Sequence, residues 1–389
     1  MQKKSKPNFF GKQFLILIIA SLFFTFVVAF VPMVKLVDRA IVISMGIDYS
    51  DNNYNISLEI VMPEGGEGNS QTKSFSVVEG KGKSILESLN EIEKNIGIKV
   101  CLGQCNIIIF GKNMISQHVI PAINNIIEKG LLPEHAYIIA TDNPTELQKT
   151  LTVTISNPGF ELQKTLYRNQ TNMNCVVCTV KKFIKDYMSE SKTVFITDVE
   201  RIKVQSDNIG DVSSYTPNKA DLYKYDYCQS IVIDHEKSVQ LGCDNSNALS
   251  VFLTQVNKGI MNIDFNGNLY SIEITGKKVK SKIDKDNNTD NYEFDIKGRL
   301  VEIENFNENL NYERITNEEL KKMGEKFSEQ LSEKLYSFID YIKENKIDVL
   351  GLRNKLYQKY GKNIKEDEIY KDPFNLTFKI DVKIKVDKT

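Results

Sequence analysis

The chain has 389 residues, of which 41% are hydrophobic and 26% are charged, so it contains enough apolar material for a buried core and enough charge for a solvated surface. Its net charge is -1 and its lysines are interleaved with acidic residues, which excludes the concentrated basic surface that nucleic-acid binding requires. The length corresponds to two or three ordinary domains of about 100 to 200 residues each.

The N-terminus is basic and continues as an unbroken apolar run. Residues 1–13 contain four lysines, and residues 14–34 carry no charge. A helix needs roughly 20 apolar residues to cross a bilayer, and positive residues stay on its cytoplasmic side. We therefore expect a cytoplasmic basic tail at residues 1–13, a transmembrane signal anchor at residues 14–34, and an extracytoplasmic body after it.

A cleaved signal peptide is the alternative to this anchor. Such a peptide has a shorter apolar core of about 7 to 15 residues, followed by a cleavage site made of small residues. Residues 27–33 (VVAFVPM) offer neither a good pair of small residues nor a cysteine for lipid attachment. The sequence therefore favours an uncleaved anchor.

The remaining chain mixes strand-like alternation with helical periodicity. Ser84 with Glu87, and Thr316 with Glu319, form capping boxes at the start of two amphipathic stretches. The predicted strands are residues 40–47, 54–61, 72–79, 99–110, 135–141, 193–204, 230–234, 260–265, 269–275, 292–303 and 374–386. The predicted helices are residues 85–96, 113–129, segments of 142–191 that include 179–187, and then 248–256, 316–342 and 349–360. This pattern predicts an α+β protein in which helices pack on mixed sheets.

A polar stretch at residues 206–220, with Gly210, Pro217 and paired serines, is the predicted linker between domains. It separates an N-terminal α+β domain at residues 35–205, with a sub-boundary near residues 142–150, from a C-terminal α+β domain at residues 221–389. The loop at residues 282–291 is charged, and we expect it to face solvent.

Six cysteines provide the clearest candidates for chemistry. Cys175 and Cys178 form a C-x-x-C, the spacing of thiol oxidoreductases and of half of many zinc sites, and a four-thiolate site would add Cys101 and Cys105. The pair follows a polar stretch and lacks the strand-to-helix context of thioredoxin-like motifs. Buried free thiols or an incidental disulfide are therefore favoured over redox or metal function. The remaining cysteines are Cys228 and Cys243.

Two loops imitate calcium sites. Residues 48–59 place oxygen-bearing side chains at EF-hand ligand positions, but Asn53 stands where the motif needs glycine, and strands flank the loop. Residues 284–288 also lack the glycine that the motif needs. We interpret both loops as solvated turns. The three histidines are His118, His135 and His235. None falls in a metal or nucleophile signature, so we predict no catalytic, cofactor-binding or metal-binding residues, and no cofactor.

Several short motifs resemble the Ger(x)C family, the C subunits of nutrient germinant receptors in spore-forming bacteria. Residues 37–48 (VDRAIVISMGID) are similar to the family's first strand, which ends in Gly-Ile-Asp. Residues 75–85 (FSVVEGKGKSI) look like its strand, glycine turn and helix start, and residues 105–111 like its next strand. Residues 346–352 (KIDVLGL) are similar to its last helix start before the closing strand. The matches occur in order over nearly all of the chain after the anchor.

The resemblance implies an α+β protein of several domains on the outer face of the inner spore membrane. It also implies assembly with polytopic A- and B-type subunits, in a complex that senses small-molecule germinants such as amino acids, sugars or nucleosides and triggers ion release. Family members usually end their signal with a lipid-modified cysteine followed by tryptophan and aspartate, and residues 30–32 lack it. A spanning helix would hold the protein at the membrane at least as firmly as acyl chains.

We therefore expect a non-enzymatic, membrane-tethered germinant-receptor subunit that acts in spore germination. Two alternatives remain open. A membrane-anchored thiol oxidoreductase would use Cys175 and Cys178 and would need a lowered pKa at Cys178. A stand-alone extracytoplasmic solute-binding protein would bind a nutrient through residues 35–389 without a partner.

Overall fold

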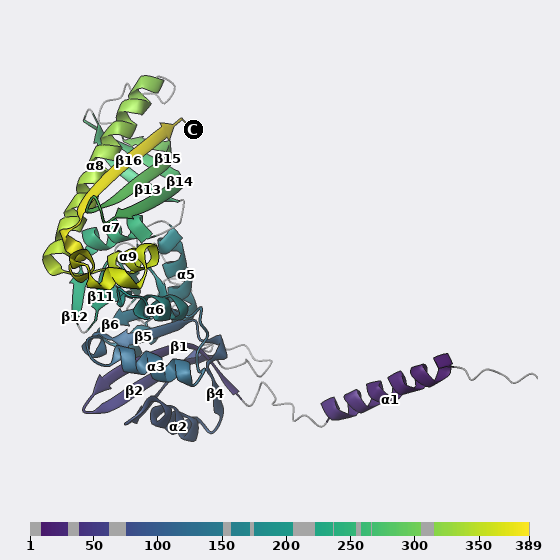
Figure 1. Cartoon of the computed structure of the whole chain (residues 1–389). Helices are drawn as coiled ribbons and strands as arrows, with labels where there is room; N and C mark the ends of the chain where they lie inside the picture. Colours follow the sequence, from purple (N-terminus) through teal and green to yellow (C-terminus); the bar gives the residue numbers. More distant parts are fainter. Residues whose placement is uncertain are drawn as a thin grey trace, which may run out of the picture.

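The computed structural model describes residues 9–29, 39–61, 75–150, 157–171, 175–204, 222–235, 237–253, 258–265, 267–304 and 315–388. After the first helix, the chain forms an elongated body in which a large sheet and a smaller sheet follow each other along the long axis, with helices on their faces (Figure 1). The prediction of an α+β protein with mixed sheets is confirmed.

Helix α1 (Phe9–Ala29) stands apart from this body (Figure 1). Its described side chains, at Phe14 and residues 16–26, are exposed. Within the described parts of the chain, no helix meets the length and apolarity needed to cross a membrane. The predicted anchor ends at Val34, which lies beyond α1 and outside the described residues, as does most of the predicted basic tail.

The large sheet has ten strands. Its centre consists of the parallel strands β1, β5, β6 and β8, with antiparallel strands on both flanks and two short strands paired to β1 and β6. Its strands are β1 (Arg39–Ser50), β2 (Asn53–Val61), β3 (Phe75–Gly82), β4 (Lys99–Cys101), β5 (Ile107–Gly111), β6 (Tyr137–Thr141), β7 (Cys178–Thr179), β8 (Thr193–Asp198), β11 (Ser230–Asp234) and β12 (Lys237–Leu241). The predicted hairpin at its start is confirmed, because β1 pairs with β2 across a turn at Asp51 and Asn52, whose φ angles are 51° and 57°.

Helices cover both faces of this sheet. Their bounds are α2 (Ile85–Ile96), α3 (Val119–Glu128), α4 (Pro144–Gln148), α5 (Pro158–Thr171) and α6 (Val180–Tyr187). α2, α3 and α6 pack into a large core, whereas α4 and α5 cover a smaller core on the opposite face. α2 begins and ends as predicted, because the Ser84 hydroxyl accepts a hydrogen bond from Glu87 N at 3.2 Å and Gly97 ends the helix with a φ of 73°.

The second sheet contains four strands in the order β13, β14, β15, β16, and a separate ribbon pairs β9 with β10. Their bounds are β9 (Glu200–Lys203), β10 (Tyr223–Asp226), β13 (Gly259–Phe265), β14 (Asn268–Asp284), β15 (Thr289–Glu304) and β16 (Thr377–Asp387). The remaining helices are α7 (Cys243–Leu253), α8 (Asn317–Asn345), α9 (Leu352–Tyr360) and α10 (Glu368–Lys371). One continuous cluster of buried side chains extends from the large sheet into this second sheet.

Helix α8 fixes the edge strand β16. The predicted capping box is present at its start, with reciprocal hydrogen bonds between Thr316 and Glu319. The hydroxyl of Ser328 accepts a hydrogen bond from Ile384 N at 3.0 Å, and that of Tyr336 accepts one from Ile380 N at 3.0 Å. Outward-facing amides of an edge strand are thereby covered by a helix of the same chain.

Several predicted elements differ from the structure, among them the helices predicted at 248–256 and 349–360, which are α7 (Cys243–Leu253) and α9 (Leu352–Tyr360). The predicted strand at 99–110 is divided into β4 and β5, because a 3-10 turn at residues 102–104 interrupts the parallel pairing with β1 between Ile41 and Ser44. The predicted helix at 113–129 begins only at Val119, and the predicted strand at 193–204 becomes β8 and β9. The loop predicted at 282–291 is mostly strand, since β14 and β15 extend to a tight turn at residues 285–288.

The predicted linker at residues 206–220 lies outside the described residues. β11 and β12, which follow it, belong to the same sheet as β8. The division into domains at this point stays a prediction.

Replacing Gly324 in α8 by alanine tests the packing of this helix on β16. A Cβ atom there would lie 2.4 Å from the carbonyl oxygen of Ile384, and backbone cannot give way as a flexible side chain does. We expect Gly324→Ala to lower the free energy of unfolding by about 1–3 kcal/mol, although alanine favours helix. Urea unfolding measures this, and Gly103→Ala is the control, because its Cβ meets nothing within 4 Å. Equal stability of Gly324→Ala and the wild type would contradict the packing.

Candidate functional site

The C-x-x-C cysteines lie on opposite faces of the large sheet. Cys175 packs with Val177 in the small core, and Cys178 packs with Val176 in the large core. Burial raises the pKa of the Cys175 thiol to about 12, and it raises that of Cys178 still further. Two thiols that are separated by the sheet and held protonated cannot act as a redox pair. The structure therefore removes the geometric basis of the thiol oxidoreductase alternative.

The other cysteines also lack the features of a reactive site. Cys228 and Cys243 form a disulfide with a Cα–Cα distance of 4.8 Å, which suits a body that folds in an oxidising compartment. Cys105 is buried, and burial raises its pKa to about 12, whereas Cys101 is a free, partly exposed thiol. The described parts of the chain contain no group of three His, Cys, Asp or Glu side chains placed to hold a metal ion.

Loss of the disulfide should destabilise the body. The bond joins residues separated by 15 positions, and closing a loop of this size contributes about 3 kcal/mol. We expect the double variant Cys228→Ser, Cys243→Ser to unfold at lower urea concentration, and reductant to have the same effect on the wild type. Cys101→Ser is the matched control that should leave the midpoint unchanged. Insensitivity of the wild type to reductant would show that the bond does not form.

In both calcium-like loops an acidic side chain accepts hydrogen bonds from neighbouring backbone amides. Asp48 accepts a hydrogen bond from Tyr49 N at 2.8 Å, and Asp284 accepts hydrogen bonds from Asp286 N at 3.0 Å and Asn287 N at 3.3 Å. Glu59, the last ligand position of the first loop, is buried inside the sheet. The arrangement agrees with the interpretation of both loops as turns.

The carboxyl ends of parallel strands are the usual ligand site of α/β sheets. Here Lys112, just after β5, reaches the carboxylates of Asp198 at 2.8 Å, Glu200 at 3.0 Å and Asp142 at 3.4 Å. These hydrogen bonds and charges raise the pKa of Lys112 even though burial opposes them. Lys112 and its three carboxylate partners therefore occupy the end of the parallel strands where a ligand would otherwise bind.

Glu59 is a carboxyl group buried between β1, β2 and the start of α5. It accepts hydrogen bonds from Ser44 Oγ at 2.6 Å and from Gly159 N at 2.9 Å, and Gln148 Nε2 donates in turn to Ser44 Oγ at 3.0 Å. Burial raises the pKa of Glu59 to about 7, although both hydrogen bonds lower it. A Cβ on Gly159 would lie 2.6 Å from the Glu59 carboxylate, so only glycine fits at this helix start.

Glu59 should make stability depend on pH in a defined direction. Its pKa of about 7 in the folded state is above its ordinary value of 4.5, so folding favours the protonated form. The cost of the buried charge is fully present above pH 7 and is relieved as the pH falls toward 4.5. From pH 8 to pH 5, the wild type should gain about 3 kcal/mol relative to Glu59→Gln, which cannot ionise. Urea unfolding of both chains measures the difference, and parallel pH profiles would disprove it.

Two buried aspartates join the two sheets. Asp234, at the end of β11, accepts hydrogen bonds from Thr193 Oγ1 and from the backbone N–H of Asp348, both at 3.0 Å. Asp348, which follows α8, accepts hydrogen bonds from Leu352 N at 2.5 Å and Arg353 N at 3.0 Å, the first two amides of α9; the helix begins at Leu352, with Gly351 as its N-cap, rather than at residue 349 as predicted. Burial raises the pKa of Asp348, and the hydrogen bond from the Arg353 amide is the largest opposing effect.

Helix α9 extends this junction to the second sheet. Lys355 Nζ lies 3.2 Å from Asp290 Oδ2 of β15 and also contacts the hydroxyl of Tyr292. On the side of the first sheet, Ser191 Oγ accepts a hydrogen bond from Asn354 N at 3.1 Å. α9 therefore connects both sheets through buried polar groups.

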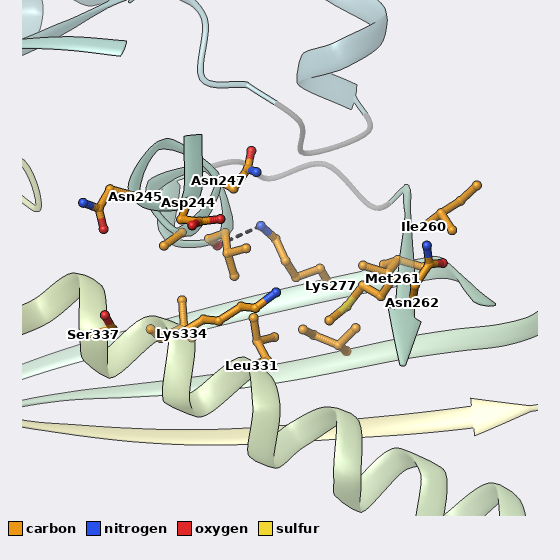
Figure 2. A pocket seen from close by; sticks show the side chains of 15 residues that line it. Asp244, Asn245, Asn247, Ile260, Met261, Asn262, Lys277, Leu331, Lys334 and Ser337 are labelled. Carbon is orange, nitrogen blue, oxygen red and sulfur yellow. Dashed lines mark hydrogen bonds between the residues drawn. The ribbon is translucent and has the colours of Figure 1, made fainter. Parts of the chain in front are cut away.

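A cavity of about 510 Å³ opens between α7, the strands β13 to β15, and α8 (Figure 2). Leu331 and Met261 contribute apolar wall, and Asn245 and Asn262 contribute amides. Figure 2 shows Lys277 reaching toward α7, where its ammonium donates a hydrogen bond to the carbonyl of Val251 at 2.9 Å. Burial lowers the pKa of Lys277 to about 8. The cavity has the size and the mixed lining of small-molecule sites.

Residues 33–201 match the family model described as the spore germination protein N-terminal domain, and residues 229–389 match the spore germination B3/GerAC-like C-terminal domain. The chain belongs to the Ger(x)C family. This Ger(x)C protein is accordingly a germinant-receptor C subunit of spore germination. The family resemblance expected from the ordered motifs is thereby confirmed.

A solved structure supports the same architecture. The crystal structure of the GerBC protein is similar to this Ger(x)C protein with a TM-score of 0.51 and 17% sequence identity, over 88% of this chain and 96% of that chain. At this identity the likeness concerns the fold alone. No curated protein sequence matches this Ger(x)C protein.

Proposed function

We propose that this Ger(x)C protein is a non-enzymatic C subunit of a nutrient germinant receptor, tethered to the inner spore membrane by residues 14–34 with its body on the outer face. The observation that carries the proposal is the match of both germination domains over residues 33–201 and 229–389. The tether would keep these domains at the membrane in which the polytopic A- and B-type subunits reside.

The anchor is supported by the sequence. Residues 14–34 are apolar without a charge, four lysines precede them, and the described side chains of α1 are exposed to the surroundings. A helix of this composition gains stability when lipid covers it, because each exposed apolar side chain is costly in water. The lysines favour a cytoplasmic N-terminus.

The proposed absence of catalysis is supported by the positions and partners of the side chains that could have been reactive. Cys175 and Cys178 are separated by a sheet, and Lys112 is engaged by three carboxylates. The oxidoreductase alternative is therefore not favoured, and the family membership disfavours a stand-alone solute-binding protein. The complex with A- and B-type subunits would bind the small-molecule germinant.

Deletion of the gene and complementation test this proposal. Spores of the deletion strain should form in normal yield but fail to lose refractility in response to one class of nutrient, and the wild-type gene should restore the response. The double variant Cys175→Ser, Cys178→Ser should also restore it. Phe23→Arg should not, because a charge at the centre of a spanning helix costs about 3 kcal/mol or more.

Two results would contradict the proposal. A normal response of the deletion strain to every nutrient would remove the receptor role. Failure of the cysteine variant, at wild-type protein level, would restore the thiol alternative.

A further inference from the structure

We infer that the large sheet rests on the membrane surface with the end of its strands at which β1 begins. Ile98 and Lys99 then lie at the level of the lipid headgroups. The inference rests on the proposed anchor, and it adds the orientation of the body on the bilayer.

The length of the tether limits where the body can lie. The apolar run ends at Val34, and β1 begins at Arg39. A fully extended chain rises at most about 3.6 Å per residue, so this segment spans at most about 18 Å. The start of β1 is therefore held close to the headgroups, whichever way the body turns.

The segment between α2 and β4 lies at this same end of the sheet. β4 pairs in parallel with the start of β1, so that Arg39 is opposite Lys99 and Ala40 is opposite Val100. Ile98, immediately before β4, is 38% exposed, and the side chain of Lys99 is 76% exposed while its ammonium lies 2.7 Å from Glu93. An exposed aliphatic side chain beside a long amphipathic lysine is suited to the boundary between hydrocarbon and headgroups.

The opposite end of the sheet lies too far away to touch the same surface when this end is seated. β1 rises about 3.3 Å per residue over its 12 residues, so its two ends are roughly 36 Å apart. Tyr54 and Gly82, which are paired across β2 and β3, lie at the far end, and α2 starts there. Leu86, near the start of α2, is 43% exposed and is therefore a counterpart of Ile98 at the other end of the same helix.

The body is oriented as a whole by this contact. Figure 1 shows α2 and β4 at one end of the body and the four-stranded sheet at the opposite end. With Ile98 at the headgroups, the end of the large sheet that carries Tyr54 and Gly82 faces away from the bilayer.

The chain contains no tryptophan, so a single introduced tryptophan reports its own surroundings. The full-length protein would be reconstituted in vesicles of phosphatidylcholine and phosphatidylglycerol in which some lipids carry a nitroxide quencher on the headgroup. We expect Ile98→Trp to lose fluorescence and Leu86→Trp to keep it. Both positions are partly exposed, and thermal unfolding should match the wild type.

A third variant separates the orientation from the anchor. Phe23→Trp in α1 should be quenched by lipids that carry the nitroxide on the acyl chain. If Phe23→Trp is quenched and Ile98→Trp is not, the anchor stands and the orientation is wrong. If Phe23→Trp is not quenched, the proposed anchor fails and the orientation fails with it. Quenching of Leu86→Trp without Ile98→Trp would overturn the orientation, as would an emission change of Ile98→Trp that occurs only when A- and B-type subunits are present.

Discussion

The arrangement of the two sheets depends on the way α9 is held between them. Asp348 starts this helix and is tied to Asp234 at the end of β11, while Lys355 of the same helix lies against Asp290 of β15. The three aspartates are buried, so a carboxylate that lost its partner would remain desolvated. Because apolar contacts tolerate sliding and buried hydrogen bonds do not, the polar junction gives the elongated body one defined geometry.

Much of the fold could be predicted from sequence because many elements carry their own start and stop signals. The capping boxes at Ser84 and Thr316 and the glycine at position 97 located helix ends within a residue or two. Errors occurred where tertiary pairing decides the local structure. Nothing local indicates that a turn at residues 102–104 interrupts this strand, because β4 and β5 are separated only in their pairing with β1.

The polar sites were harder to predict than the elements. Glu59 alternates with apolar residues, so its face of β2 looks solvated, and only the long-range placement of α4 and α5 buries it. For Cys175 and Cys178 the error would run the other way. Their C-x-x-C spacing suggests thiol redox chemistry, but the sheet holds the two thiols in separate cores. Asp348 lies next to the predicted helix at 349–360, but its hydrogen-bond partner Asp234 is 114 residues away along the chain. The sequence shows which ionisable side chains are present and how they are spaced. The folded environment determines the pKa of each side chain and whether it can take part in chemistry.

The parallel pairing of β16 with β15 has a consequence for folding. β16 is the last strand of the chain, and the whole segment from α8 to α10 separates it from its partner. β16 covers part of the apolar stripe of α8, so the second sheet is completed only when this strand is available. Contacts of such sequence separation form slowly and leave apolar surface exposed meanwhile. Assembly of the second sheet is therefore expected to be a late step in folding, and a chain shortened by its last dozen residues would lack the strand that pairs with β15 and packs on α8.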